Sequence, residues 1–418
     1  MRVADFIFDR DRVDRSAPVG FHPAQRRRSV IVRTAFVSTY PPRRCGIATF
    51  TSDLARVTPD SEVAALHPSG SALTYPLKVR QRIRKHELAD YRRTAQDLNR
   101  AVDVVSIQHE YGIWGGEDGE HVLDFVRALR VPSIATLHTV LREPTPHQRS
   151  VLTELVSLVD STVVMSRSAA NLLISAYDVD PDRLQVIPHG VPDVALVDSA
   201  SIKPGLDLKG RDVVLSFGLL GPGKGYELAI EALPAIAAAH PDVLYVILGA
   251  THPDLISAQG EAYRDSLKAA IRRLGMERHV RFVDRFVSGD ELKRWLQAAD
   301  VFVTPYPNLG QIVSGTLSYA MAAGRPIVST PYTYASELLA DGRGVLVEPG
   351  SAAALADGLT TVVGDPELRA AIGRRAHAYT RRMIWPAVGA EYTSLFRLTS
   401  LGSRAAATQI RMGQPIHV

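Results

Sequence analysis

The sequence predicts an α/β protein built from two Rossmann-like, doubly wound parallel-sheet domains. Three observations support this fold class. The chain has 418 residues, which is too many for one hydrophobic core, and 46% of them are apolar. Short apolar runs alternate with amphipathic segments of helix length, and this alternation is typical of βαβ units. The alternation stops between residues 191 and 210, where Pro, Gly and Ser accumulate.

The first series of elements predicts an N-terminal domain over residues 33–195. Residues 1–32 precede any strand pattern and are rich in Arg and Asp, so we expect a loose N-terminal extension there. The expected strands are 34–40, 104–110, 133–139 and 161–166, and the expected helices are 48–57, 119–130, 146–159 and 168–176.

The second series predicts a C-terminal domain over residues 205–382, and the tail from about residue 402 is expected to be loose. Ligands of such a sheet bind at the carboxyl ends of its strands. The expected strands are 213–218, 243–250, 280–284, 301–306, 326–330 and 344–349.

Composition excludes several classes of protein. The single cysteine, Cys45, excludes an intramolecular disulfide, and we interpret it as a small apolar residue. No apolar run reaches the ~18 residues of a membrane span, and the N-terminus lacks a signal-peptide pattern. The net charge of +4 is too small to indicate nucleic-acid binding. We therefore expect a cytoplasmic protein with no nucleic-acid partner.

The stretch LSFGLLGPGKGYELAIEAL, residues 215–233, combines an apolar strand, a glycine-rich turn and an amphipathic helix. Gly218 and Gly223 allow backbone N–H groups to approach a phosphate, and the following helix adds a partial positive charge. Lys224 can hold an anionic leaving group. The turn therefore indicates a diphosphate site; a plain βα turn is the alternative.

A second stretch, PYPNLGQIVSGTLSYAMAAGRPIVSTPY at 305–332, again joins a strand end to a helix that starts with small residues. Together the two stretches resemble the donor half of retaining family 4 glycosyltransferases, which have the GT-B fold. The first half of the chain agrees with this resemblance, which covers roughly residues 34–396. Its motifs are STYPPRRCGIATFTSDLA (38–55), TLHTV (136–140), VVMSRSAANLL (163–173) and VIPHGVP (186–192).

The resemblance implies two domains that face each other across a cleft, with a last helix at about 385–400 that crosses back onto the first domain. It also implies a retaining, metal-independent transferase that moves a hexose from a nucleoside diphosphate sugar to a glycan, lipid or small-molecule acceptor. No cofactor is expected. GDP-mannose is our preference over glucose and N-acetylglucosamine donors.

For the donor side, the resemblance gives roles to residues of both stretches. Lys224 and the amides of Ile312 and Val313, which we expect to open a helix, would stabilise the leaving diphosphate. Gln311 and Tyr319 occupy the positions of the paired glutamates of the family, so Gln311 would face the sugar and Tyr319 the ribose. The other expected donor-binding residues are Gly46, Gly218, Gly223, Ser314 and Gly315.

One further departure from the family concerns charge. The family normally has an arginine five residues before the lysine, and Leu219 stands there in this chain. Arg285 is a candidate substitute, and a solvent-exposed arginine is the alternative.

His138 matches the family's strand-end histidine and is the third expected catalytic residue, with Lys224 and Gln311. The loop after residue 108 combines polar and aromatic residues, which suits acceptor recognition by stacking and polar contact. The expected acceptor-binding residues are Arg44, His109, Glu110, Tyr111 and Trp114; an ordinary βα loop is the alternative. No metal site is predicted, because nothing completes a spaced zinc-ligand set around these histidines.

The segment 75–100 is strongly basic, and its apolar residues recur near helical spacing. We expect an amphipathic helix that permits peripheral contact with an anionic membrane. A solvated helix covering the sheet is the simpler interpretation.

Two other functions remain open at this point. The chain could be a nucleotide-sugar-binding protein without efficient transfer, because Leu219, Gln311 and Tyr319 replace charged residues of the family. It could also be another GT-B enzyme, such as a sugar-nucleotide epimerase or a glycoside phosphorylase.

Overall fold

The structure is a computed structural model that describes residues 31–411, with side chains except those of Asp254 and residues 403–411. The extension predicted over residues 1–32 lies almost wholly outside the described residues. Within them, the strands form two parallel sheets, as the sequence predicts. No helix among the described residues is both long and apolar enough to cross a membrane.

The first sheet contains seven of the described strands in the order β3-β2-β1-β4-β5-β6-β7. β1, β4 and β5 are buried along their whole length, because helices cover both faces of the sheet. The strands are β1 (Thr34–Ser38), β2 (Ser61–His67), β3 (Val79–Arg84), β4 (Val104–His109), β5 (Ser133–Leu137), β6 (Ser161–Val164) and β7 (Leu184–Val186).

The prediction of one basic helix over residues 75–100 is wrong in its first half. Residues Val79–Arg84 form the edge strand β3, and the helix α2 begins only at Leu88. Arg82 and Arg84 point to solvent while Ile83 between them is buried, which is the period-two pattern of a strand. Charged side chains on an edge strand also prevent unwanted pairing with other chains.

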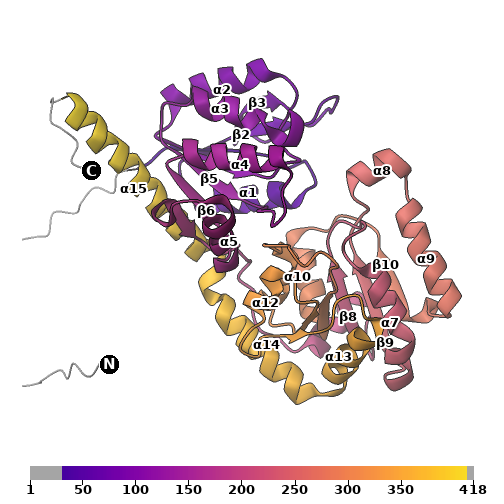
Figure 1. Ribbon diagram of the computed structural model, residues 1–418. Helices are drawn as coiled ribbons and strands as arrows, with labels where there is room; N and C mark the ends of the chain where they lie inside the picture. Colours follow the sequence, from indigo (N-terminus) through magenta and orange to yellow (C-terminus); the bar gives the residue numbers. More distant parts are fainter. Residues whose placement is uncertain (1–30, 412–418) are drawn as a thin grey trace, which may run out of the picture. The chain divides into compact units, whose positions relative to one another are not determined.

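Two helical layers cover the first sheet. Helix α1 and the last helix, α15, pack on one face, and α2 to α5 pack on the other. Figure 1 shows α15 running alongside the elements of the first sheet. The helices are α1 (Gly46–Val57), α2 (Leu88–Ala101), α3 (His121–Ala128), α4 (Pro146–Leu158), α5 (Arg167–Tyr177) and α15 (Trp385–Arg411).

The second sheet contains six of the described strands in the order β10-β9-β8-β11-β12-β13. Alternate residues of β8 point to opposite faces, so Val213 and Leu215 belong to one core and Val214 to the other. The strands are β8 (Asp212–Phe217), β9 (Val243–Leu248), β10 (Val280–Val283), β11 (Val301–Thr304), β12 (Ile327–Ser329) and β13 (Val345–Leu346).

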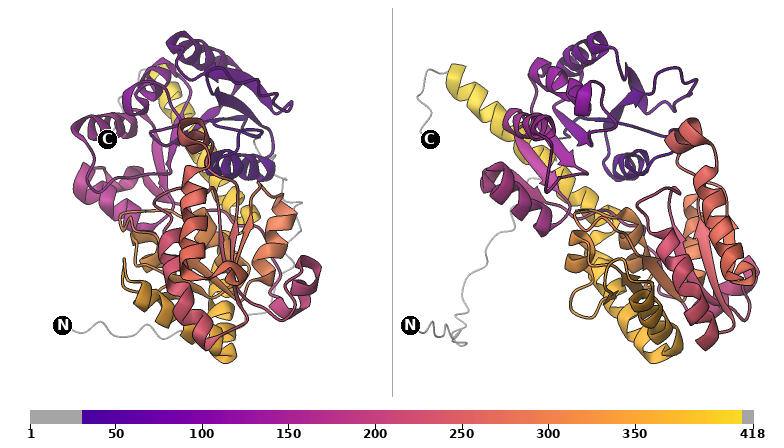
Figure 2. Two further views of the ribbon diagram at one scale, coloured as in Figure 1. Left: turned by 90° about the vertical axis from the view of Figure 1, so that its right-hand side faces the viewer. Right: turned by 45° about the vertical axis from the view of Figure 1, so that its right-hand side comes forward.

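Helices also cover both faces of the second sheet (Figure 2). α7, α9 and α13 pack on one face, and α10, α11, α12 and α14 pack on the other. The helices are α6 (Ser199–Ile202), α7 (Tyr226–Ala239), α8 (Pro253–Gln259), α9 (Ala262–Leu274), α10 (Gly289–Ala298), α11 (Gly315–Ala322), α12 (Thr333–Leu338), α13 (Ala352–Gly364) and α14 (Pro366–Thr380). Short 3-10 turns occupy Glu117–Gly119, Pro181–Arg183, Lys203–Leu206, Glu277–His279 and Arg381–Met383.

Helix α15 is fixed to the first sheet by aromatic residues. The Tyr392 hydroxyl lies 3.1 Å from the Thr136 hydroxyl of β5, and the Phe396 ring lies edge-on to Phe36 of β1 with the centroids 6.0 Å apart. The helix continues to Arg411, so residues 402–411, where the sequence predicts a loose tail, have a helical backbone.

Both sheets reverse their strand order once, between β1 and β4 in the first and between β8 and β11 in the second. At such a switch point the two connections leave in opposite directions, which opens a crevice at the carboxyl ends of the two strands. Most of the candidate site residues lie at or after the ends of these four strands, while His138 follows β5 and Arg285 follows β10.

The packing of α15 predicts unequal effects of two substitutions on the same helix. Phe396→Ala removes a buried ring and should lower the free energy of unfolding by about 3–5 kcal/mol. Leu398→Ala, at a side chain that is 69% exposed, should change it by less than about 0.5 kcal/mol. Denaturant unfolding measures both variants. Equal losses would contradict the packing of α15 on the sheet.

Candidate functional site

The glycine turn after β8 is shaped by a close backbone approach. Gly225 has a φ of +71° and precedes α7, and a Cβ atom on it would lie 1.9 Å from the carbonyl oxygen of Pro305. Only glycine fits there. This contact joins the turn after β8 to the segment after β11, across the switch point of the second sheet.

Lys224 lies in this turn and faces the same segment. Its ammonium group is 4.6 Å from the centre of the Tyr306 ring, and the Tyr306 hydroxyl is 3.0 Å from the hydroxyl of Thr316 in the first turn of α11. One tyrosine therefore lies between the lysine and the start of α11. The side chain of Lys224 is half-buried, which strengthens its electrostatic effect on a bound anion.

Helix α11 begins later than the sequence predicts. Its N-cap is Ser314, whose hydroxyl accepts a hydrogen bond from the Leu317 amide, so the first helical amides belong to Gly315 and Thr316. The expectation that Ile312 and Val313 open the helix is therefore wrong, because the serine hydroxyl caps it more effectively than an apolar residue. Ile312 instead packs into the core of the first sheet.

The two positions that correspond to the paired glutamates of the family are both engaged within the protein. The side-chain amide of Gln311 donates to the carbonyl of Val313 at 2.8 Å, which leaves its own oxygen as an acceptor. The Tyr319 hydroxyl donates to Asp53 of α1 at 3.1 Å. Burial raises the pKa of Tyr319 to about 12, so the hydroxyl stays protonated and continues to donate.

Two further donor-side candidates, Arg285 and Gly46, and the acceptor-side candidate Arg44 have different surroundings. Arg285, directly after β10, forms an ion pair with Glu291 and is largely exposed. Arg44 lies over the ring of Phe286, 5.9 Å from its centre. Gly46 begins α1, and a Cβ atom there would meet no atom within 4 Å, so the space beside this residue is open.

Two histidines follow the neighbouring strands β4 and β5 of the first sheet. His138 contacts the Gln108 side chain at 2.9 Å and lies edge-on to Phe50. His109 is fully buried, and neither ring nitrogen has a hydrogen-bond partner among the described residues. Burial lowers the pKa of His138 to about 3 and that of His109 to about 4, so both rings are neutral at pH 7.

The predicted acceptor loop contains one residue that cannot serve as predicted. Trp114 is 1% exposed, its indole N–H donates to the Gln108 carbonyl, and its ring packs between Tyr91 and Phe125. It therefore fills the core and offers no face to a sugar. Glu110 caps the same loop by accepting from the Gly112 amide, and Tyr111 is also mostly buried.

Sequence reasoning missed a histidine that lies beside the start of α11. His189 lies edge-on to Phe50 of α1, and a Cβ atom on Gly315 would lie 2.9 Å from its Nε2 atom. Burial lowers the pKa of His189 to about 4. The motif VIPHGVP contains it, but the motif alone does not show which helix start it faces.

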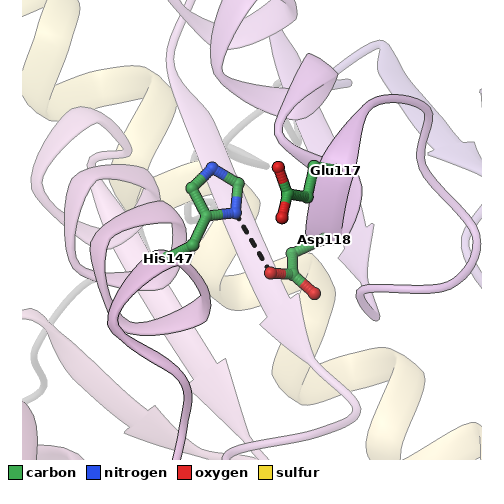
Figure 3. Close-up of side chains that lie close together, drawn as sticks. All are labelled: Glu117, Asp118 and His147. Carbon is green, nitrogen blue, oxygen red and sulfur yellow. Dashed lines mark hydrogen bonds and ion pairs between the residues drawn. The ribbon is translucent and has the colours of Figure 1, made fainter.

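One group of potential metal ligands occurs among the described residues, next to the predicted acceptor loop. Glu117 and Asp118 of the 3-10 turn after β4 lie close to His147 in the first turn of α4 (Figure 3). The His147 Nδ1 atom is 3.0 Å from Asp118, and this hydrogen bond raises the pKa of His147. A protonated His147 that donates a hydrogen bond to Asp118 accounts for the close approach of these side chains.

The buried state of His109 predicts a specific dependence of stability on pH. Its pKa is about 4 in the folded protein and ~6.5 in the unfolded chain, so acid protonates the unfolded state first. Above pH ~6.5, His109 is neutral in both states and does not lower the free energy of unfolding. As the pH falls from ~6.5 toward 4, protonation of the unfolded chain lowers this free energy by roughly 3 kcal/mol. Unfolding measured at several pH values should be less acid-sensitive in His109→Phe. The matched change of exposed His86 should not alter the acid sensitivity, and an unchanged acid profile in His109→Phe would contradict the prediction.

Comparison with known proteins identifies the two halves of the chain separately. Residues 46–194 match the family model described as Glycosyltransferase Family 4, and residues 198–379 match the model described as Glycosyl transferases group 1. A D-inositol 3-phosphate glycosyltransferase of Corynebacterium glutamicum is 28% identical over 287 residues, which are 64% of this chain and 66% of that protein. The match thus spans slightly less than two thirds of that relative.

One further relative and two solved structures are also similar to this chain. A phosphatidyl-myo-inositol mannosyltransferase of Mycobacterium tuberculosis is 30% identical over 224 residues, 52% of this chain and 55% of that protein. Among solved structures, Anabaena HepE in complex with UDP has a TM-score of 0.71 at 18% identity and covers 88% of this chain and all of its own. Sucrose-phosphate synthase of Thermosynechococcus elongatus has a TM-score of 0.69 at 16% identity, over 88% of this chain and 98% of that one. With both family models matched in order and this fold, the protein belongs to the family 4 glycosyltransferases of the GT-B class.

Proposed function

We propose that the protein is a retaining glycosyltransferase that moves a hexose from a nucleoside diphosphate sugar to a polyol, glycan or lipid acceptor. The observation that carries the proposal is that Tyr306 contacts both Lys224 and Thr316 in the first turn of α11, at the switch point of the second sheet. Both groups stabilise negative charge, and both lie where a parallel sheet binds ligands.

This geometry suits the chemistry of sugar transfer. When the bond between the sugar and the diphosphate breaks, negative charge develops on the leaving oxygens. The Lys224 ammonium and the amides of Gly315 and Thr316 can stabilise that charge, so no metal ion is needed in this mechanism. Retention of configuration follows from the family resemblance and is part of the proposal.

The relatives narrow the donor and acceptor only in part. Two of them are named for inositol-containing acceptors, and one of these is a mannosyltransferase. Structural neighbours bind UDP or UDP-glucose. We therefore propose a hexose donor, keep mannose as the preferred sugar, and test UDP- and GDP-linked sugars together. Neither a sugar-nucleotide epimerase nor a glycoside phosphorylase would transfer a sugar from a nucleotide sugar to an acceptor, and the same assay detects this difference.

Peripheral membrane contact through the segment 75–100 remains part of the proposal. Arg80 and Arg82 of the edge strand β3 are exposed, which favours an anionic surface. Other basic residues of the segment are already paired, since Arg84 and Arg93 both bind Asp90.

The second candidate function is a nucleotide-sugar-binding protein without efficient transfer. Gln311 and Tyr319 favour this second function. Both replace the glutamates of the family, and both side chains already form hydrogen bonds within the protein. Leu219 also removes one cation from the diphosphate site. Product formation separates the two functions, since donor binding is common to both.

Lys224→Ala should lower the rate of transfer by at least about 100-fold, because one group that stabilises the leaving charge is removed. Lys209→Ala, at an exposed lysine of the same domain, is the matched control and should leave the rate unchanged. Anomeric NMR of the product, from a panel of nucleotide sugars, measures the rate and the configuration.

The denaturation midpoints of both lysine variants should match that of the parent protein. Equal rates for Lys224→Ala and the parent would remove Lys224 from the mechanism. A strict requirement for added Mg²⁺ or Mn²⁺ after treatment with EDTA would contradict the metal-independent part of the proposal.

Gln311→Ala tests whether the glutamine faces the sugar. Loss of one hydrogen bond should weaken binding of the nucleotide sugar by about 1 kcal/mol while binding of the bare nucleoside diphosphate stays the same. In a working transferase, the rate should fall by more than the affinity, because sugar positioning matters most in the transition state. Calorimetry with both ligands measures the difference, and equal weakening would show that Gln311 does not contact the sugar.

A further inference from the structure

A hollow lies beside the candidate donor site, and none of the predicted site residues lines it. It has a volume of about 700 Å³, and we call it the arginine pocket, after Arg142 and Arg167 in its lining. Arg142 lies in the loop after β5, and Arg167 begins α5 directly after β6. The opposite wall includes Leu309 and Gly310, which precede Gln311 in the chain, and Pro331 after β12.

All these segments follow the carboxyl ends of parallel strands, where α/β sheets bind ligands. The lining residues lie in segments that follow strands of both sheets. Because Gly310 is the residue before Gln311, a ligand in the pocket would lie next to the position proposed for the donor sugar. That is the place at which an acceptor has to be held.

The charge of the pocket favours an anion. The side chains of Arg142 and Arg167 are exposed, and neither guanidinium forms an ion pair within the described residues. Glu337 is the one acid in the described lining. Its carboxylate accepts from the amides of Arg167 at 3.0 Å and Ser168 at 2.9 Å, and from the Ser168 hydroxyl at 2.7 Å.

Glu337 therefore interacts with the N-terminus of α5 and forms no ion pair with either guanidinium group among the described residues. Two arginines against one glutamate give the lining a net positive charge. Guanidinium groups bind phosphate oxygens with two parallel hydrogen bonds, which gives them a preference for phosphate over monovalent anions.

The other lining residues indicate what else the ligand carries. Asn171 lies one turn after Arg167 on α5 and offers a side-chain amide, which can bind hydroxyl groups. Leu309, which is 41% exposed, and Pro331 form an apolar surface on which the ring of a sugar or polyol can pack. A phosphate with an attached polyol or sugar fits both kinds of contact.

We propose that the arginine pocket binds the phosphate group of a phosphorylated polyol or sugar, which serves as the acceptor. Arg142 and Arg167 hold the phosphate, and Asn171 contacts a hydroxyl group. The acceptor role rests on the proposed transferase function, whereas phosphate binding in the pocket does not. The same phosphate chemistry is found in free metabolites and in lipid headgroups, so the experiment includes both.

The experiment uses the full chain, first saturated with UDP or GDP so that the diphosphate site is filled. Inorganic phosphate and glycerol 3-phosphate are then titrated by calorimetry, and phosphatidylinositol vesicles are tested by co-sedimentation. Arg142→Gln and Arg167→Gln should each weaken phosphate binding about tenfold, and the double variant should abolish it. The matched control is Arg130→Gln. Arg130 is exposed and precedes β5, so it lies at the amino ends of the strands, whereas the pocket lies at their carboxyl ends.

Nucleotide binding and the melting temperature should be the same in all variants. Phosphate binding that both arginine variants leave unchanged, or that disappears when the nucleotide site is filled, would overturn the proposal. Arginine-dependent binding of glycerol 3-phosphate indicates a free acceptor, and arginine-dependent binding of vesicles alone indicates a lipid headgroup. If the parent binds no nucleotide, the transferase proposal fails separately, and titration of the nucleotide-free protein still tests the pocket.

Discussion

The candidate donor site depends on one close approach between two backbones. The turn after β8 can reach the segment after β11 only because Gly225 has no side chain, since any Cβ atom would overlap the Pro305 carbonyl. A similar constraint holds Gly249 against the carbonyl of Gly218. With these two contacts, Lys224, Tyr306 and the start of α11 converge at one point. The contacts are also the reason that a cation and free helical amides can act on one ligand.

Hydrogen bonds also link the segments around the first sheet to those around the second. Ser166 donates to the carbonyl of Ile312, Tyr319 donates to Asp53, and Glu337 accepts from the first amides of α5. Two of these bonds involve the α11 region, which also supplies the proposed donor contacts. The helix that would bind the diphosphate is therefore positioned partly by the first sheet. A ribose that used the Tyr319 hydroxyl would have to compete with Asp53.

The elements that sequence reasoning located well are those buried on both faces, such as β4 and β9, because their apolar runs differ clearly from helical patterns. The edge strand β3 was mistaken for helix, since its exposed arginines and the following amphipathic α2 form one basic stretch. β2 was not predicted, and β7 is only three residues long. Trp114 was placed in the acceptor site because an aromatic residue in a glycine-rich loop has the same local pattern whether it faces solvent or fills a core.

The sequence by itself determined the fold class, the family and the candidate residues Lys224, Gln311 and His138, because their motifs are local and the order of motifs reflects the topology. Only the tertiary structure decided which partners these residues have. The bond from Tyr319 to Asp53 joins residues 266 positions apart, and the arginine pocket combines loops after β5, β6, β11 and β12. Such contacts depend on how separate elements pack, and local periodicity carries no information about the distance between them.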